Sequence, residues 1–332
     1  MSPVTKIEVI PDSSKSHWVN RAPVGMRPYL QLSRLDRPVG YWLLALPGWI
    51  GLAFAGLNQG LVWMDLLWAV LILIGAIAMR GAGCTYNDIV DQDLDAQVER
   101  TALRPLPAGT VTTKQAWRWT FAQIGVGFLV WLCLPLLAKG IALLALPLVA
   151  AYPFMKRITW FPQVWLGMTF NWAVLVAYAV KTEEISLPVL ILYLGLIFWT
   201  VGYDTIYACQ DMEDDAMVGI KSTALRFGGH VKLAVGVCYA FATALCWLAI
   251  SASHYNYDAD YVVPEGGYTI DMSGAVIALL YFIPLAGFTF HLIWQVLKFR
   301  PENTETSLKL FKSNYWAAFL LIGPLLWTAS AE

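Results

Sequence analysis

Long apolar segments constrain the fold of this chain more than any other feature of its sequence. A helix needs about 20 mainly apolar residues to cross the hydrocarbon core of a bilayer. Charged residues make up only 14% of the chain, whereas they make up about a quarter of a soluble domain. Nine segments are candidate transmembrane helices: residues 39–57, 61–79, 116–138, 141–154, 164–180, 187–203, 231–252, 274–297 and 315–328. The sequence therefore predicts an all-α integral membrane protein with nine transmembrane helices.

One of these segments and one connection give local predictions. Residues 141–154 form a short segment that contains Pro147 and Pro153, so among the nine it has the weakest support as a separate span. Only residues 58–60, with the sequence Asn-Gln-Gly, separate the first two segments, so they predict a tight turn.

The distribution of basic residues predicts how the helices are oriented. If the N-terminus is cytoplasmic, 20 of the 22 Lys and Arg lie on the cytoplasmic side, and only Lys139 and Lys181 do not. Cytoplasmic segments of membrane proteins carry an excess of basic residues, so this orientation is predicted. Because the basic residues follow the topology and are not gathered on one face, nucleic-acid binding is not expected.

The chain is expected to consist of a polar cytoplasmic N-terminal arm, residues 1–28, and one membrane domain, residues 29–332. The arm has neither the apolar core of a signal peptide nor the Arg-rich, acid-poor composition of a transit peptide. This composition favours a bacterial cell inner membrane over a mitochondrial inner membrane as the location of the protein.

An acidic stretch, residues 86–109, follows the second apolar segment. On a helix, Asn87, Asp91 and Asp95 are spaced at i, i+4 and i+8, so their side chains share one face. Three oxygen donors on one face suit Mg²⁺, which takes a few carboxylates together with substrate phosphates and water. Asp88 and Asp93 point away from that face, and we expect them to support the site from outside or to lie on the surface. The alternative for this stretch alone is a solvated helix end with ordinary surface acids.

A similar stretch, residues 204–229, returns later in the chain, with Asp211 and Asp215 again four apart. Both stretches contain the string Thr-Ala-Leu-Arg after their acids. An even number of predicted helices separates them, so both emerge on the cytoplasmic side. Carboxylates at i and i+4 repel one another, and divalent cations with an anionic ligand would relieve that repulsion. We therefore expect the two stretches to face each other across a cavity and to bind a magnesium diphosphate. Nearby basic side chains would donate to the phosphate oxygens: Arg100, Arg104, Lys221 and Arg226.

Three further polar sites leave alternatives open. Lys156, in the turn at residues 152–163, is either a phosphate ligand or an ordinary basic residue at the cytoplasmic membrane surface. Asn171, within the fifth apolar segment, either bonds a neighbouring helix or lines a pocket. Asp36 and Arg37, at the start of the first segment, form either an interfacial ion pair or part of the site.

These motifs carry a family resemblance. The pattern NDxxDxxxD at residues 87–95, followed by RTALRPLPAG, resembles the first aspartate motif of the UbiA superfamily of intramembrane prenyltransferases, and DMEDD at residues 211–215 resembles the second. Other strings are similar to the 4-hydroxybenzoate polyprenyltransferase branch of that superfamily: DRPVG at residues 36–40, RGAGCTYND at 80–88, YPFMKR at 152–157, PQVWLG at 162–167 and GYDTIYACQDMEDDAMVGIKSTALRFG at 202–228.

The resemblance implies a nine-helix fold around a central cavity that is open to lipid, with Mg²⁺ at a cytoplasmic cap. It assigns the metal ligands as Asn87, Asp91, Asp95, Asp211 and Asp215, among which Asp91 and Asp211 are expected to be essential for catalysis. It assigns the diphosphate ligands as Arg100, Arg104, Tyr152, Lys156 and Lys221.

The resemblance also implies the reaction. A polyprenyl diphosphate would ionise, and its allylic cation would prenylate the ring carbon of 4-hydroxybenzoate ortho to the hydroxyl, a membrane step of ubiquinone biosynthesis. Asp204 is the candidate that activates the phenol or takes the ring proton, and Arg37 and Asn171 are candidates for binding the aromatic substrate. Two alternatives are prenyl transfer to another acceptor, such as another quinone precursor or haem, and transport of divalent cations or organic anions.

Overall fold

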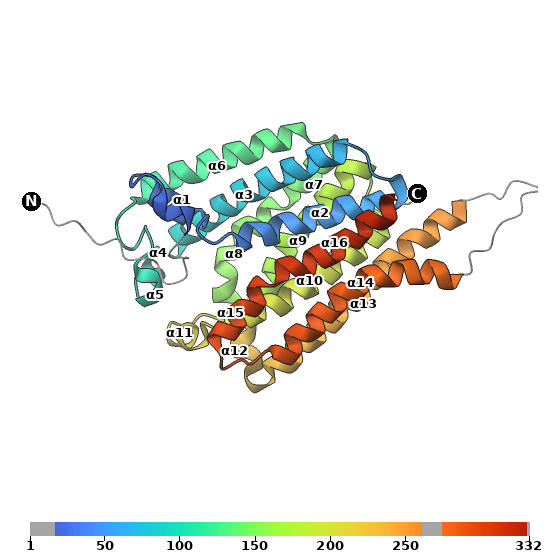
Figure 1. Cartoon of the computed structure of the whole chain (residues 1–332). Coiled ribbons are helices and arrows are strands. Elements are labelled where there is room, and N and C mark those ends of the chain that lie inside the picture. Colours follow the sequence, from blue (N-terminus) through green and yellow to red (C-terminus); the bar gives the residue numbers. More distant parts are fainter. Residues whose placement is uncertain (1–16, 98, 261–273, 331–332) are drawn as a thin grey trace, which may run out of the picture. The chain divides into compact units, whose positions relative to one another are not determined.

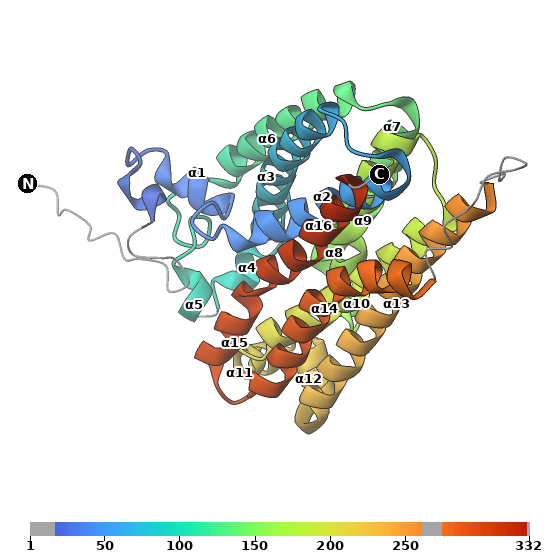
Figure 2. The same cartoon turned by 45° about the vertical axis from the view of Figure 1, so that its right-hand side comes forward.

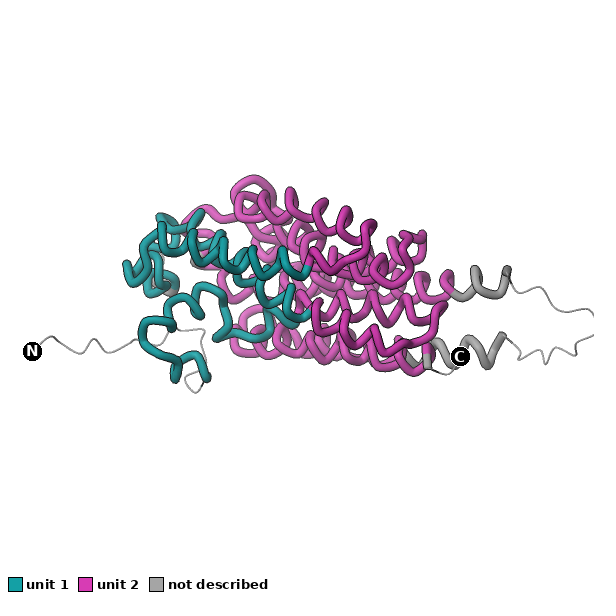
Figure 3. The backbone as a smooth tube through the Cα atoms, turned by 90° about the horizontal axis from the view of Figure 1, so that it is seen from above, with its two compact units in different colours: residues 1–42, 73–130 teal, residues 43–72, 131–332 magenta. Residues whose placement is uncertain are grey.

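The computed structural model describes residues 17–97, 99–260 and 274–330. All regular structure in these residues is helical, and the chain divides into two compact units, coloured separately in Figure 3. Unit 1 comprises residues 1–42 and 73–130, and unit 2 comprises residues 43–72 and 131–332. Each unit is described by itself.

Unit 1 contains the N-terminal helices and the helices around the first acidic stretch. Its elements are η1 (Trp18–Arg21), α1 (Arg27–Leu32), the start of α2 (Val39–Gln59), most of α3 (Met64–Val90), α4 (Gln92–Asp95), α5 (Glu99–Ala102) and most of α6 (Thr113–Cys133). The predicted boundary between residues 28 and 29 falls inside α1, and residues 1–16 of the predicted arm lie outside the described residues.

Close packing in unit 1 depends on a glycine of α3. A Cβ atom on Gly81 would lie 1.8 Å from Oε1 of Gln123 on α6, so a side chain there would displace the Gln123 amide. The same Gln123 oxygen accepts a hydrogen bond from Ser33 at 2.9 Å, and Ser33 in turn accepts one from Trp119 at 2.8 Å. These buried bonds tie the segment after α1 to the middle of α6 and place the following residues near the end of α3.

Unit 2 contains the remaining long helices. Its elements are the rest of α2 and α3, α7 (Leu136–Leu144), α8 (Leu146–Ile158), α9 (Pro162–Thr182), α10 (Leu187–Ala208), α11 (Met212–Met217), α12 (Thr223–Phe227), η2 (Gly228–His230), α13 (Val231–Asp260), α14 (Gly274–Lys298), α15 (Thr304–Lys312) and α16 (Asn314–Ser330). Helix α10 packs against α9, α13 and α15, and α14 packs against α13 and α16 (Figures 1 and 2). The Trp199 indole of α10 is fully buried and donates to Asn314 at the start of α16, at 2.9 Å.

The helices agree with a multi-pass membrane protein. Among the described residues, six helical stretches are long and apolar enough to cross a membrane: Val39–Gln59, Met64–Val90, Leu136–Ile158, Pro162–Thr182, Leu187–Ala208 and Thr223–Ser253. All nine predicted segments lie largely on helices. Helix α16 has only 17 residues, fewer than the about 20 that a membrane span needs. The predicted all-helical architecture is therefore confirmed, with six membrane-spanning candidates among the described residues, and the number of nine transmembrane helices stays a prediction.

Prolines set the helix boundaries that the predicted segments missed. The third predicted segment ran to residue 138, whereas α6 ends at Cys133 and Pro135 is the N-cap of α7. Proline has no N–H group to donate to the preceding turn, so it starts helices and interrupts them. Pro147 lies in the first turn of α8, which separates α8 from α7 within the fourth predicted segment. The predicted tight turn after α2 is confirmed, with Gly60 at φ +64°.

Candidate functional site

The first acidic stretch continues helical geometry past the end of α3. The Asp91 N–H donates to the Asn87 carbonyl at 2.9 Å, and the Asp95 N–H donates to the Asp91 carbonyl at 2.8 Å. The side chains of Asn87 and Asp91 are in contact, since Asn87 Nδ2 donates to Asp91 Oδ2 at 3.0 Å. Asp91 and Asp95 are 1% and 7% exposed. The structure thus brings Asn87 and Asp91 together as the spacing predicts, and the solvated helix end is wrong for these acids.

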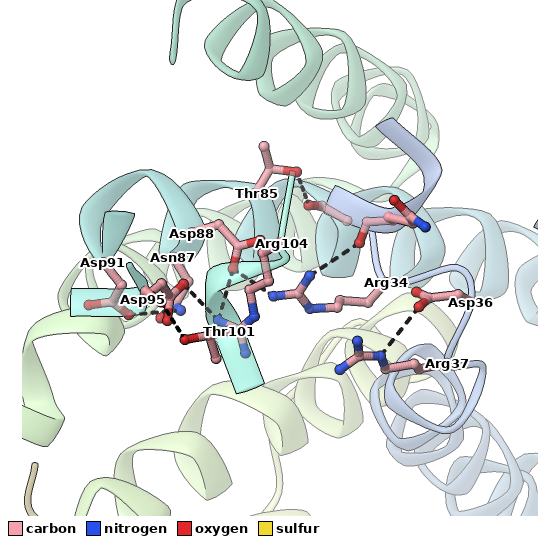
Figure 4. A network of polar contacts seen from close by, with 12 residues as sticks. Arg34, Asp36, Arg37, Thr85, Asn87, Asp88, Asp91, Asp95, Thr101 and Arg104 are labelled. Atoms are coloured by element: carbon pink, nitrogen blue, oxygen red, sulfur yellow. Dashed lines mark hydrogen bonds and ion pairs between the residues drawn. The ribbon is translucent and has the colours of Figure 1, made fainter. Parts of the chain in front are cut away.

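Asp95 is paired with a residue from the Thr-Ala-Leu-Arg string. Arg104 Nη1 lies 2.7 Å from Asp95 Oδ2, and the Thr101 hydroxyl donates to the Asp95 carbonyl at 2.7 Å. The chain after α4 therefore folds back onto the acids (Figure 4). Burial raises the pKa of the Asp95 carboxyl, and the nearby Arg104 guanidinium only partly offsets that rise.

Asp88 is the most buried acid of the first stretch, so a surface position for it is wrong. Its carboxylate is fully buried and lies 2.6 Å from Arg34 Nη2 and 3.6 Å from Arg104 Nη1. Burial lowers the pKa of Arg34, but nearby acidic groups, Asp88 foremost with Asp36 and Asp95, together outweigh burial, so the pKa of Arg34 is raised. Asp93 is exposed, as expected. Figure 4 shows Arg34, Asp88, Arg104 and Asp95 as one connected chain of charges.

The second acidic stretch is less enclosed. Asp211 follows the end of α10, and the Asp215 N–H in α11 donates to the Asp211 carbonyl at 2.7 Å. Asp211 and Asp215 are half-buried, as is Asp204 on α10. The two acids are again one helical turn apart, as the sequence predicts. This stretch lies in unit 2 and the first stretch in unit 1.

The second stretch is tied to the turn between α8 and α9. The Lys221 N–H donates to the Lys156 carbonyl at 2.9 Å, the Lys221 ammonium donates to the Ile158 carbonyl at 3.2 Å, and that ammonium lies over the Trp160 ring. The structure therefore brings together two of the predicted diphosphate ligands, Lys156 and Lys221, at the level of the main chain. Tyr152 lies half-buried on α8, four residues before Lys156.

Three buried polar side chains that were not predicted as site residues hold the second stretch in place. Gln163 Oε1 accepts a hydrogen bond from the Thr223 N–H at 3.1 Å. The hydroxyls of Thr223 and Thr205 lie 2.6 Å apart, and all three residues are buried. Gln163 lies in the first turn of α9, so this connection pins the start of α12 to α9 and α10.

The remaining predicted residues have different surroundings. Asn171 is fully buried, and its amide nitrogen donates to Gly167, Leu196 and Thr200, which joins α9 to α10. Of the two alternatives for Asn171, the structure shows the bond to a neighbouring helix. Arg37 Nε lies 3.4 Å from Asp36 Oδ2, which is the predicted ion pair. Arg100 lies on α5, and its side chain is outside the described part of the chain.

The oxygen donors of the first acidic stretch fit a Mg²⁺ ion whose coordination is completed by a bound substrate and water. Within the residues that the structure describes, no three His, Cys, Asp or Glu side chains form a group that could hold a metal ion by themselves. Mg²⁺ is usually bound by one or two carboxylates together with substrate phosphates and water, and rarely by an all-protein cage. Buried oxygen donors such as Asp91 and Asp95, with Arg104 beside them, agree with that mode.

The comparison with protein families decides the class of the chain. The UbiA prenyltransferase family matches residues 44–323. The chain belongs to this family. Both acidic stretches lie within the matched residues.

Curated relatives within the UbiA family are named for one acceptor. The 4-hydroxybenzoate polyprenyltransferase, mitochondrial, of Aedes aegypti is 47% identical over 220 residues, which is 66% of this chain and 48% of the mosquito protein. The protein of the same name from Drosophila melanogaster is 38% identical over 89% of this chain and 69% of its own length. The 4-hydroxybenzoate geranyltransferase 1 of Lithospermum erythrorhizon is 38% identical over 93% of both chains.

Solved structures of the family share the fold. The apo structure of a UbiA homolog from Aeropyrum pernix K1 has a TM-score of 0.66 at 23% identity, and it covers 87% of this chain and 98% of that one. The UbiA homolog from Archaeoglobus fulgidus, bound to GPP and Mg²⁺, has a TM-score of 0.63 at 18% identity and covers 91% and 99%.

Proposed function

We propose that this chain catalyses Mg²⁺-dependent transfer of a polyprenyl group from a polyprenyl diphosphate to 4-hydroxybenzoate. The new bond forms at the ring carbon ortho to the hydroxyl, in a membrane step of ubiquinone biosynthesis. The observation that carries the proposal is the family match over residues 44–323, with relatives from mosquito, fruit fly and a plant that are named for 4-hydroxybenzoate.

Five oxygen-bearing side chains hold the metal. They are Asn87, Asp91 and Asp95 of the first stretch and Asp211 and Asp215 of the second. The hydrogen bond between the Asn87 and Asp91 side chains supports this assignment, because it keeps two of the donors in one place. Bound Mg²⁺ neutralises the diphosphate and makes it a better leaving group.

Basic and phenolic side chains bind the diphosphate: Arg100, Arg104, Tyr152, Lys156 and Lys221. Charge-assisted hydrogen bonds from these residues stabilise the charge that develops on the leaving group as the allylic C–O bond breaks. The joined main chains of Lys156 and Lys221 support a shared role for the two segments. Apolar walls keep water from the allylic cation.

Asp204 and two further residues act on the aromatic acceptor. Asp204 activates the phenol or takes the ring proton, and its half-buried position on α10, two turns before Asp211, supports that role. Arg37 binds the carboxylate of 4-hydroxybenzoate. The amide nitrogen of Asn171 is already bonded, so its carbonyl oxygen, which has no hydrogen-bond partner among the described residues, is the atom that meets the acceptor.

The protein crosses the membrane nine times, with a central cavity and with the N-terminus and the acidic cap on the cytoplasmic side. The distribution of Lys and Arg supports this orientation. We place it in the bacterial cell inner membrane, and the mitochondrial names of the insect relatives make the mitochondrial inner membrane the alternative.

One assay tests the proposed function. The purified protein is supplied with Mg²⁺, geranyl diphosphate and a panel of acceptors, and diphosphate release and prenylated product are measured. Release and product with 4-hydroxybenzoate are expected. Release only with another quinone precursor or with haem would correct the acceptor, and uptake into liposomes without release would point to a transporter.

A further inference from the structure

Arg104 lies near two carboxylates of the first acidic stretch. Its Nη1 is 2.7 Å from Asp95 Oδ2 and 3.6 Å from Asp88 Oδ1. The first distance is that of a charge-assisted hydrogen bond, and the second is too long for one. Arg104 is therefore bonded to Asp95 and attracted by Asp88. It occupies an oxygen of a carboxylate that we assign to the metal.

A metal ion and Arg104 compete for that oxygen. When a divalent cation binds Asp95, Arg104 needs another acceptor, because a largely buried charge without a partner is strongly unfavourable. The Asp88 carboxylate offers such an acceptor. Its Oδ2 is buried and has no hydrogen-bond partner among the residues described.

Asp88 itself is held in place from the other side. Arg34 Nη2 donates to Asp88 Oδ1 at 2.6 Å, and Arg34 Nη1 donates to the Gln31 carbonyl at 3.2 Å. Arg34 has φ +54°, a left-handed conformation that is strained for a residue other than glycine. The bonds of Arg34 to Asp88 and Gln31 hold Arg34 in this conformation, and Arg34 in turn holds the Asp88 carboxylate in place. Asp88 is therefore the fixed acceptor, and Arg104 is the side chain that moves.

We propose that Asp88 is a positioning residue: it receives the Arg104 guanidinium when a divalent cation displaces Arg104 from the Asp95 carboxylate. The proposal rests on the proposed function. Asp88 acts through Arg104 and contacts neither the metal nor the substrates.

Two variants that break the same ion pair test the proposal, because they shift Arg104 in opposite directions. In Asp88→Asn the acceptor loses its charge, Arg104 stays on Asp95, and Mn²⁺ binding to the diphosphate-free protein weakens about tenfold. In Arg34→Gln the Asp88 carboxylate loses its other cation and attracts Arg104 more strongly. Arg104 then leaves Asp95 more easily, so Mn²⁺ binding tightens by about the same factor. Mn²⁺ replaces Mg²⁺ as the probe, and electron paramagnetic resonance measures its binding.

Two controls complete the experiment. In an Arg104→Gln background, Asp88→Asn is expected to change Mn²⁺ binding by less than about twofold, since its effect passes through Arg104. Asp93→Asn neutralises an exposed carboxylate on α4, the short helix that carries Asp95, and is expected to leave Mn²⁺ binding unchanged.

The outcomes separate the two proposals. Mn²⁺ binding that shifts in the same direction in Asp88→Asn and Arg34→Gln, or an Asp88→Asn effect that persists without Arg104, would overturn the role of Asp88. If Asp88→Asn does not fold, Arg34→Gln decides by itself: Mn²⁺ binding that does not tighten in this variant overturns the role of Asp88. Wild-type protein that releases no diphosphate with any acceptor would instead overturn the proposed function.

Discussion

The two acidic stretches share a spacing but are built differently. In the first stretch Asp88, Asp91 and Asp95 are buried, and Arg34 and Arg104 join Asp88 and Asp95 in one network. In the second stretch Asp211 and Asp215 are half-buried, and their segment is fixed by hydrogen bonds of its main chain to Lys156 and Gln163. Charged side chains thus link the acids of the first stretch, whereas main-chain hydrogen bonds fix the segment that follows the acids of the second stretch. We expect the first to set metal affinity and the second to set how the diphosphate is held.

The largest expected effect is loss of prenyl transfer. Asp91→Ala and Asp211→Ala should each lower the transfer rate by about 10³-fold or more, because each removes a carboxylate that holds the metal against the leaving group. The rates are measured in membranes supplied with Mg²⁺, with protein amounts matched by immunoblot. Near-normal rates in both variants would contradict the metal assignment, and a normal rate in Asp211→Ala alone would remove the second stretch from the metal site.

Asp204→Asn is expected to slow transfer by about 10²-fold while binding of the diphosphate substrate is retained. The amide keeps the size of the side chain but takes up a proton poorly. Single-turnover product formation measures the rate, and titration with an unreactive diphosphate analogue measures binding. If the variant loses analogue binding instead, Asp204 is a ligand of the metal–diphosphate complex and not the base.

Asp88→Ala is expected to lower the free energy of unfolding by about 3 kcal/mol, because it leaves Arg34 with a buried and uncompensated charge. Thermal unfolding in detergent measures the change. Asp215→Ala in the half-buried second stretch is the matched variant and should change the free energy of unfolding by less than about 1 kcal/mol. Equal losses in the two variants would remove the difference in construction between the stretches.

The smallest expected effect is at Gln163. Gln163→Leu leaves the Thr223 N–H without its buried acceptor, which costs about 1–2 kcal/mol. Because this bond pins the segment after Asp215, the KM for the prenyl diphosphate should rise by about fivefold with little change in kcat. A change in kcat with an unchanged KM would show that the second stretch does more than hold the diphosphate.

The sequence predicted the parts of this molecule that depend on local patterns. Apolar length predicted the helices, and the four-residue spacing predicted that Asn87 and Asp91 meet. The partner of Asp88 could not be predicted in this way, since Arg34 lies 54 residues away and reaches it only through the packing of α1. The bond from Gln163 to Thr223, over 60 residues, was missed for the same reason. Proline positions were available in the sequence, and they would have corrected the third predicted segment at Pro135.

One binding measurement tests most directly the claim that both acidic stretches bind one magnesium diphosphate. Isothermal titration calorimetry follows geranyl thiolodiphosphate binding to wild type, Asp91→Ala and Asp211→Ala, each with Mg²⁺ and with EDTA. We expect tight binding only to wild type with Mg²⁺, and a loss of at least about 10²-fold in each variant. Unchanged Mg²⁺-dependent affinity in either variant would contradict the claim.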